Sequence, residues 1–175
     1  ASFASGERSL SSLFASDRIL KDGDLGVFDI GSIYEGYLGD IARTGGAGNV
    51  SGQARMVYTA AYDALMAGTK AVRPGVPSSE VDKIIRETLI AADCRVSPLS
   101  TGHGIGVGAP EIPWITPREE GIPDFELRPG MVLCLEPRTG KDGVTAAGCE
   151  DMILVTATGN EVLTKCARQE HLLVR

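Results

Sequence analysis

Residues 28–44 read FDIGSIYEGYLGDIART, and this stretch decides which fold we expect. A short apolar run around Phe28 is followed by mixed Tyr, Ile and Gly residues, and the glycines weaken any helical interpretation. The pattern predicts two β-strands. Asp29 and Asp40 interrupt these strands eleven residues apart. Because two strands joined by a turn can bring such positions face to face, we expect the two carboxylates to lie close together.

Two helices are expected after the paired strands. The first covers about residues 51–72, where Ala, Met, Tyr and Leu recur near helical spacing. The second begins near Pro77, where Ser79 and Asp82 resemble a capping box with a shorter acid. From Gly102 onward, short apolar runs separated by Gly and Pro turns are typical of β-structure. The whole pattern predicts an α+β domain with two helices beside a curved sheet.

Composition excludes several classes of protein. A chain of 175 residues with 43% hydrophobic and 23% charged residues fits one globular domain with a real core. The net charge of −6, without a basic stripe, argues against nucleic-acid binding. No apolar run approaches the roughly 18 residues of a membrane span. The first residue is Ala1, no signal peptide follows it, and the opening looks like mid-domain sequence, so we expect the later part of a longer polypeptide.

The four cysteines are widely spaced and form no CxxC pair. We interpret them as buried or half-buried thiols of a protein in a reducing cytoplasm rather than as a disulfide framework. The glycine-rich segment GHGIGVG lacks the GK[ST] ending of a nucleotide-binding loop, and the chain contains no GxSxG nucleophile elbow.

Five residues with metal-ligating side chains lie in or beside the predicted strands. They are Asp29, Asp40, His103, Glu136 and Glu150. A carboxylate in a buried strand is costly unless it is paired or binds a cation, and only Arg43 and Arg138 lie close by in sequence. Two divalent ions would balance four carboxylates and a hydroxide better than one ion. We therefore predict a two-metal hydrolytic centre. The alternative, exposed acids at strand ends plus a core histidine, suits any one position but not all five together.

The segments FDIGSIYEGYLGDIART, TGHGIG, LRPGMVLCLEP and EDMILVT carry these five residues. In that order they resemble the pita-bread metallopeptidases, a group that includes methionine aminopeptidases, Xaa-Pro aminopeptidases and Xaa-Pro dipeptidases. The resemblance covers nearly the whole chain and is closer to the proline-peptidase branch. It implies the pita-bread fold, a curved antiparallel sheet with helices on one side. Residues 1–175 would be the C-terminal portion of the catalytic domain, without the N-terminal part.

The resemblance also implies a role for each of the five residues. Asp29 would bind one metal ion, Asp40 and Glu150 would bridge the two ions, and His103 and Glu136 would complete the ligand shell of the second ion. A hydroxide shared by the metals would attack a carbonyl, with Glu136 relaying its proton to the leaving nitrogen. Glu136 and His103 are thus the expected catalytic residues. A shell of oxygen atoms with one imidazole favours Mn²⁺, with Co²⁺, Zn²⁺ or Fe²⁺ as alternatives.

One departure from the family pattern concerns substrate handling. Pro110 stands where the peptidases carry a second histidine, in a His-Glu-x-Pro motif that contacts the substrate. Proline cannot donate a hydrogen bond, and losing one donor to a developing oxyanion costs on the order of 100-fold in rate. Three functions stay open. The favoured one is a proline-directed peptidase, and the others are a pita-bread enzyme acting on a small amide or related substrate, and a non-catalytic binding module.

Further expectations concern the surroundings of the site. Tyr34, Tyr37 and Trp114 are candidates for lining a pocket, and Trp114 is the strongest of the three. Arg43 is expected to neutralise the carboxylate cluster without binding metal itself. The Pro- and Glu-rich loop at 109–130 is too long for a plain connection and is expected to border the site. The second histidine, His171, is interpreted as a surface or terminal-strand residue. The partners implied are a small peptide or amide substrate and a second copy of the chain in a homodimer.

Overall fold

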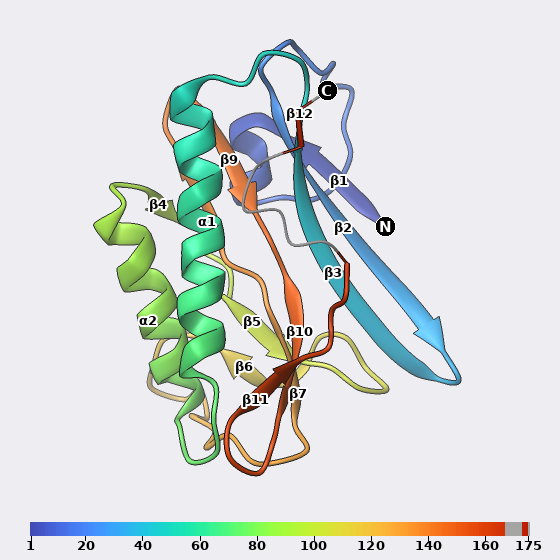
Figure 1. Ribbon diagram of the computed structural model, residues 1–175, viewed down its shortest axis with the longest axis vertical. Helices are drawn as coiled ribbons and strands as arrows, with labels where there is room; N and C mark the ends of the chain where they lie inside the picture. Colours follow the sequence, from blue (N-terminus) through green and yellow to red (C-terminus); the bar gives the residue numbers. More distant parts are fainter. Residues whose placement is uncertain (167–172, 175) are drawn as a thin grey trace.

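The computed structural model describes residues 1–166, 173 and 174, and in this part of the chain two helices pack side by side against the β-strands (Figure 1). The helices are α1 (Gly52–Ala71) and α2 (Ser78–Ala91), and a short 3-10 helix, η1, covers Gly6–Leu10. The strands are antiparallel in every pair that the structure describes except β3 and β12. The predicted α+β class with two helices is confirmed.

The strands form three sheets. The four-stranded sheet has the order β1 (Ser2–Ser5), β2 (Leu25–Tyr34), β3 (Tyr37–Gly46) and β12 (Leu173–Val174). The five-stranded sheet has the order β11 (Asn160–Val162), β10 (Asp151–Val155), β7 (Val132–Leu135), β5 (Gly102–Gly104) and β6 (Glu111–Ile115). The three-stranded sheet has the order β4 (Arg95–Val96), β8 (Arg138–Lys141) and β9 (Thr145–Gly148).

Strands β2 and β3, which contain residues 28–44 except for the two turn residues, form a long hairpin. Its two turn residues, Glu35 and Gly36, both have positive φ, 50° and 87°, as a tight two-residue hairpin turn requires. The register pairs Gly31 with Asp40 and Asp29 with Ala42. Side chains alternate between the faces of a strand, so Asp29 and Asp40 lie on the same face as diagonal neighbours.

Helix α1 begins and ends where the sequence predicts. The Oγ of Ser51 accepts a hydrogen bond from the backbone N–H of Ala54 at 3.1 Å, which caps the helix start. The helix ends at Ala71, shortly before Pro74. Local signals therefore define both ends of this element.

The expected capping box of α2 is wrong. Pro77 holds the N-cap position without a side-chain hydrogen bond, and the acceptor is Asp124, which receives bonds from the Ser79 N–H at 3.1 Å and the Ser79 Oγ at 2.8 Å. Burial acts to raise the pKa of Asp124, but these hydrogen bonds hold it below its usual value. Asp82 instead accepts bonds from Arg86 and from the hydroxyl of Thr101, each at 2.7 Å. The long loop supplies the cap that the local sequence lacks.

The main core lies between the helices and the five-stranded sheet. It includes Leu65, Ile85, Leu133, Leu135 and Ile153, all at most 1% exposed. On β7 the side chains alternate, so the two leucines face the helices and Cys134 between them faces the opposite side. This opposite face of β7 is the one turned toward the hairpin.

Two smaller expectations have been tested. No helix within the described residues is long and apolar enough to cross a membrane. None of the four cysteines, all of which fall within residues 1–166, forms a disulfide, and Cys134 and Cys149 are buried. The expectation of buried or half-buried thiols fails at Cys166, which is exposed, because this part of the chain lies beyond β11 and outside the core.

Candidate metal centre

The hairpin and the five-stranded sheet each contribute to one cluster of ligand-type side chains. Asp40 comes from β3, and His103 from β5. Cys134 and Glu150 lie in the same group. One ligand atom from each of the four residues lies within 4.8 Å of the other three. The structure therefore brings together segments that are far apart in the sequence.

Glu136 and Asp29 lie beside this group. The Nε2 of His103 is 3.7 Å from the Oε1 of Glu136. The carboxylate of Asp29 raises the pKa of Asp40, after burial the largest cause of that shift. All five predicted ligands thus belong to one cluster, although the tightest group of four includes Cys134 in place of Asp29 and Glu136.

His103 is held in one tautomer. Its Nδ1 is 2.9 Å from the carbonyl oxygen of Gly104, and because a carbonyl only accepts, Nδ1 must carry the proton. The lone pair of Nε2 is then directed at Glu136 and the rest of the cluster, which is the orientation of a metal-binding imidazole.

The glycines beside His103 allow close packing of the neighbouring strands. A Cβ on Gly102 would lie 2.3 Å from the carbonyl oxygen of Cys134, and one on Gly104 would lie 2.3 Å from that of Ile112. These glycines let β7 and β6 approach β5 closely, and this approach fixes the backbone of His103 between its two neighbouring strands.

Glu150 is the most deeply buried acid of the cluster. Its residue is 1% exposed, and its backbone N–H donates to the carbonyl of Ala42 at 3.0 Å. Its Oε1 is buried and has no hydrogen-bond partner among the residues that the structure describes. A buried carboxylate oxygen in this condition is expensive unless a cation accepts its charge.

Arg138 is the cation that lies inside the cluster. Its Nη2 donates to Glu136 at 2.7 Å and to Asp29 at 3.2 Å, and the residue is 7% exposed. Arg43 lies an odd number of residues from Asp40 and so faces the other side of β3, where its Nη1 donates to the backbone carbonyl of Glu150. There it pairs with Asp151 at 2.8 Å. Its expected neutralising role stays a prediction.

The electrostatics of the cluster show unbalanced negative charge. Burial is the largest cause that raises the pKa of Glu150, and the charges of Glu136 and Asp40 raise it further. Burial likewise raises the pKa of Asp40 and of Glu136, although Arg138 opposes the shift at Glu136. Three of the four carboxylates therefore resist ionisation where they stand, because one guanidinium does not balance them.

The donor set fits divalent metal ions. Four carboxylates and one imidazole are the ligand types of first-row transition ions, and a carboxylate oxygen of Glu150 lies within 4.8 Å of the ligand atoms of Asp40 and His103. Cations would also remove the repulsion that raises the carboxylate pKa values. The second histidine of the chain, His171, lies outside the described residues.

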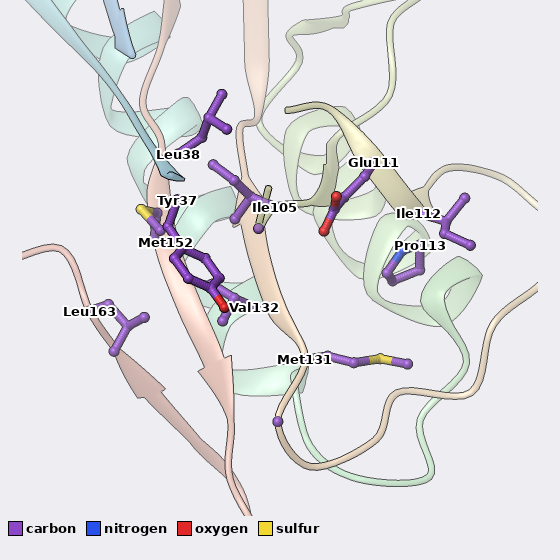
Figure 2. A pocket seen from close by; sticks show the side chains of 12 residues that line it. Tyr37, Leu38, Ile105, Glu111, Ile112, Pro113, Met131, Val132, Met152 and Leu163 are labelled. Atoms are coloured by element: carbon purple, nitrogen blue, oxygen red, sulfur yellow. The ribbon is translucent and has the colours of Figure 1, made fainter. Parts of the chain in front are cut away.

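A cavity of about 390 Å³ lies near the cluster. Figure 2 shows the side chains that line this cavity. Tyr37, Ile105 and Glu111 contribute to its wall, and Glu111 is its one ionisable carboxylate. Met152 joins the cavity to the cluster, because it lines the cavity while its Sδ accepts a bond from the Asp40 N–H at 3.4 Å. The cavity is otherwise apolar, so it suits an apolar group held next to the carboxylates.

The aromatic pocket candidates divide among different places. Tyr37 lines the cavity of Figure 2, whereas Trp114 lines a second cavity of about 470 Å³ and meets the ring of His103 edge-on at 6.2 Å. Tyr34 is 77% exposed at the hairpin tip. Pro110 is exposed in the connection between β5 and β6. The segment 109–130 was expected to be a loop bordering the site, but it contains β6, and the cavity-lining residues Glu111 and Trp114 belong to that strand.

Sequence reasoning missed Cys134 and Met152. The register places Cys134 opposite His103 on one side and opposite Met152 on the other, so the three side chains form a row across β5, β7 and β10. Cys134 appears in the sequence within the apolar run MVLCLE and was interpreted as a core thiol. Its even spacing from Glu136 was the available signal, because residues two apart share a face of a strand.

An α+β fold that gathers carboxylates and one imidazole from several strands, with a cavity alongside, is typical of proteins with a metal centre. The chain belongs to Metallopeptidase family M24, whose model matches residues 1–157.

The relatives agree with this family and its fold. The chain is 34% identical over 172 residues to an uncharacterized peptidase of Bacillus subtilis, covering 97% of the chain and 48% of the relative. It is 34% identical over 170 residues to an Xaa-Pro dipeptidase of Pyrococcus horikoshii, and this match covers 95% of the chain and 47% of the dipeptidase. A solved dipeptidase structure from Pyrococcus horikoshii superposes with a TM-score of 0.87 at 31% identity. The match covers 99% of the present chain and 48% of the dipeptidase chain. The pita-bread fold is thereby confirmed.

The chain spans about half the length of the curated relatives that it matches. The family and the fold are therefore stated for this chain, whereas its activity, substrate and partners follow as a proposal.

Proposed function

We propose that the chain is the metal-binding part of a proline-directed peptidase that cleaves Xaa-Pro bonds with two divalent ions. The single observation that supports this most is the buried cluster itself. A carboxylate oxygen of Glu150 without a partner, together with three carboxylates of raised pKa, is a costly arrangement that a non-catalytic module would have no reason to keep.

In this proposal Asp29, Asp40, His103, Glu136 and Glu150 hold the ions. Asp40 and Glu150 would serve both ions, Asp29 would serve the first, and His103 and Glu136 would serve the second. The ions, when bound, supply an activated water and stabilise negative charge on the substrate carbonyl. With Arg138 included, four carboxylates and a hydroxide are balanced by one guanidinium and two divalent ions.

Side chains of the protein transfer the proton, position the ligands and line the substrate cavity. Glu136 moves a proton from the attacking water to the leaving nitrogen, and its raised pKa suits a group that must both accept and release a proton. Arg138 holds Glu136 and Asp29 in place through Nη2. The apolar wall around Tyr37 excludes water from one side of the scissile bond and receives an apolar part of the peptide.

The remaining assignments of the proposal come from the sequence. Considered without Cys134, the oxygen-rich shell favours Mn²⁺. Residues 1–175 would belong to one catalytic domain, and the protein would act in the cytoplasm as a homodimer. Size-exclusion chromatography with light scattering tests the dimer directly, because a single species at the monomer mass contradicts it.

The experiment that tests the function is a hydrolysis panel read by mass spectrometry. The chain is loaded with Mn²⁺, and in parallel with Co²⁺, and given Xaa-Pro dipeptides, longer Xaa-Pro peptides, Met-peptides and small amides. Metal-dependent cleavage of Xaa-Pro bonds, abolished by EDTA and restored by metal, is the expected result. The variant Glu150→Gln is the matched inactive control, because it removes the charge of the most buried ligand.

Other outcomes of the panel favour the alternatives. Cleavage of a small amide with no peptide turnover would replace the proline peptidase by a pita-bread hydrolase of another substrate. The residue Pro110, which replaces a substrate-contacting histidine, is the observation that favours this second function. Silence toward every compound, with metal bound, would favour a binding module.

A further inference from the structure

The row of side chains across the five-stranded sheet contains a sulfur atom that the metal-binding pattern does not use. Cys134 lies on β7 directly opposite His103 on β5. In an antiparallel sheet, residues directly opposite share a face, with Cβ atoms about 4.5–5.5 Å apart. The thiol and the imidazole therefore project together into the cluster.

The position of the sulfur is that of a ligand rather than that of a core residue. Its Sγ and the ligand atoms of Asp40, His103 and Glu150 all lie within 4.8 Å of one another. The neighbouring residues Leu133 and Leu135 belong to the core between sheet and helices, whereas Cys134 is absent from that core cluster although it is fully buried.

A second observation independently indicates a bound cation at this place. Glu150 is one of the four residues in the group and is 1% exposed. Within residues 1–166, 173 and 174 its buried Oε1 has no hydrogen-bond partner. A thiol is at best a weak donor to such an oxygen. A cation between the carboxylate, the imidazole and the sulfur would satisfy all three groups at once.

We propose that Cys134 is a sulfur ligand of the ion held by His103, Asp40 and Glu150, so that the centre prefers Co²⁺ or Zn²⁺ to Mn²⁺. This inference rests on the metal centre of the proposed function but not on its peptidase activity. On coordination the S–H bond breaks, the sulfur keeps the electron pair and binds the ion, and the proton passes to solvent.

The metal preference follows from ligand softness. Thiolate ligands favour zinc and other thiophilic ions, whereas carboxylate-rich shells suit Mn²⁺. Bonds of about 2.3 Å from zinc to sulfur and about 2.0 Å to an imidazole nitrogen bring the two ligand atoms within about 4 Å. Only small side-chain rotations are needed to reach that separation from the arrangement described.

The test is a titration of Co²⁺ into the EDTA-treated chain, followed by absorption spectroscopy without substrate. A sulfur ligand produces an intense sulfur-to-cobalt charge-transfer band in the near ultraviolet, whereas oxygen and nitrogen ligands alone give only weak visible bands. Because Cys94 and Cys166 are not fully buried and would bind cobalt adventitiously, the titration uses a Cys94→Ser/Cys166→Ser background.

Two variants in that background decide the assignment. Cys134→Ser is expected to lose the charge-transfer band while the weak visible bands persist. The matched control Cys149→Ser removes a thiol that is equally buried and adjacent to Glu150, but that packs in the hydrophobic core, and it is expected to keep the band. Persistence of the band in Cys134→Ser would overturn the proposal, and so would its absence from the parent protein at saturating Co²⁺.

A competition measurement gives the second readout. Cys134→Ser is expected to weaken Co²⁺ and Zn²⁺ binding about tenfold or more, with a smaller change for Mn²⁺. Equal losses for all three ions would contradict a sulfur ligand and indicate a packing role. Since neither measurement uses a substrate, a missing charge-transfer band leaves the hydrolysis panel unaffected. A peptidase that fails the panel can still show the band.

Discussion

At the scale of single residues, Glu136 and Arg138 lie two positions apart and meet at 2.7 Å. Burial raises the pKa of Glu136, while the guanidinium opposes that shift. The net effect of these two opposing causes is a raised pKa of Glu136. Its second neighbour is the Nε2 of His103, at 3.7 Å from Oε1.

The variant Glu136→Gln tests the proton-carrying role. We expect kcat on an Xaa-Pro dipeptide to fall by about 100-fold or more, because an amide cannot relay a proton, while bound metal is retained through the amide oxygen. Turnover and metal content by mass spectrometry are measured together. The exposed Glu161→Gln on β11 is the control, and undiminished turnover in Glu136→Gln would exclude the role.

The variant Arg138→Leu tests the balance of charge. Removing the guanidinium leaves Asp29 and Glu136 facing each other without a cation, so we expect the free energy of unfolding in EDTA to fall by about 2 kcal/mol. Added Mn²⁺ should recover part of the loss, because the ions take over the neutralisation. Urea unfolding with and without Mn²⁺ provides the measurement. An equal loss in the exposed Arg128→Leu control would show that the position is unimportant.

At the scale of elements, prediction from sequence succeeds where the signals are local. Ser51 and Pro74 bound α1, and the observed helix lies between them. The start of α2 could not be predicted in detail, because its capping carboxylate, Asp124, is 45 residues away from the Ser79 that it contacts. The β2–β3 hairpin was predictable because its two-residue turn determines the register of everything before and after it.

The close packing of β5 against β6 depends on Gly104, and this dependence can be tested. A methyl group there would lie 2.3 Å from the carbonyl oxygen of Ile112, so β6 must move away from β5. We expect Gly104→Ala to lower the free energy of unfolding by about 1–3 kcal/mol and to weaken metal binding, because His103 is displaced with its strand. Gly159→Ala is the matched control, since nothing lies within 4 Å of its added methyl.

Thermal unfolding and a Co²⁺ titration measure the two effects of Gly104→Ala separately. A variant that binds metal as tightly as the parent would mean that the close approach of β6 and β5 has no part in positioning the imidazole. A variant that loses both stability and metal, while Gly159→Ala loses neither, supports the interpretation.

At the scale of the whole molecule, residue types identify the candidate ligands, whereas only the packing of the strands shows how these ligands come together. Asp29, Asp40, His103, Glu136 and Glu150 could be selected from the sequence because acids and an imidazole interrupt strands of otherwise apolar or glycine-rich character. Their meeting in space could not be derived without the family resemblance, since it depends on how the hairpin packs against β5, β7 and β10.

Cys134 shows the limit of that reasoning. In the sequence it is one apolar residue among five, and composition alone assigns it to the core. Only the pairing of β7 with β5 shows that it faces His103 rather than α1. Arg43 and Arg138 show the same limit, because both lie near ligands in sequence, but Arg138 pairs with carboxylates of the cluster whereas Arg43 pairs with Asp151.

The charge of the cluster makes the stability of the molecule depend jointly on metal and pH. Asp40, Glu136 and Glu150 have raised pKa values, so the folded chain binds more protons than the unfolded chain above the usual carboxyl values of about 4. In EDTA, stability should therefore be greatest at acidic pH and should fall as pH rises through the raised values. Metal binding requires the ionised carboxylates, so the stabilisation by Mn²⁺ should grow over the same range.

The expected result is a larger Mn²⁺-dependent rise in Tm at about pH 7.5 than at about pH 5.5. At a free Mn²⁺ concentration 100 times Kd the gain is about 2.7 kcal/mol, which corresponds to roughly 5–10 °C for a chain of this size. Asp40→Ala should abolish the rise, because the bridging carboxylate is lost, whereas the exposed Asp17→Ala should keep it. A rise of equal size at both pH values would contradict the linkage. A rise that survives in Asp40→Ala would mean that the ions stabilise the protein from some other place.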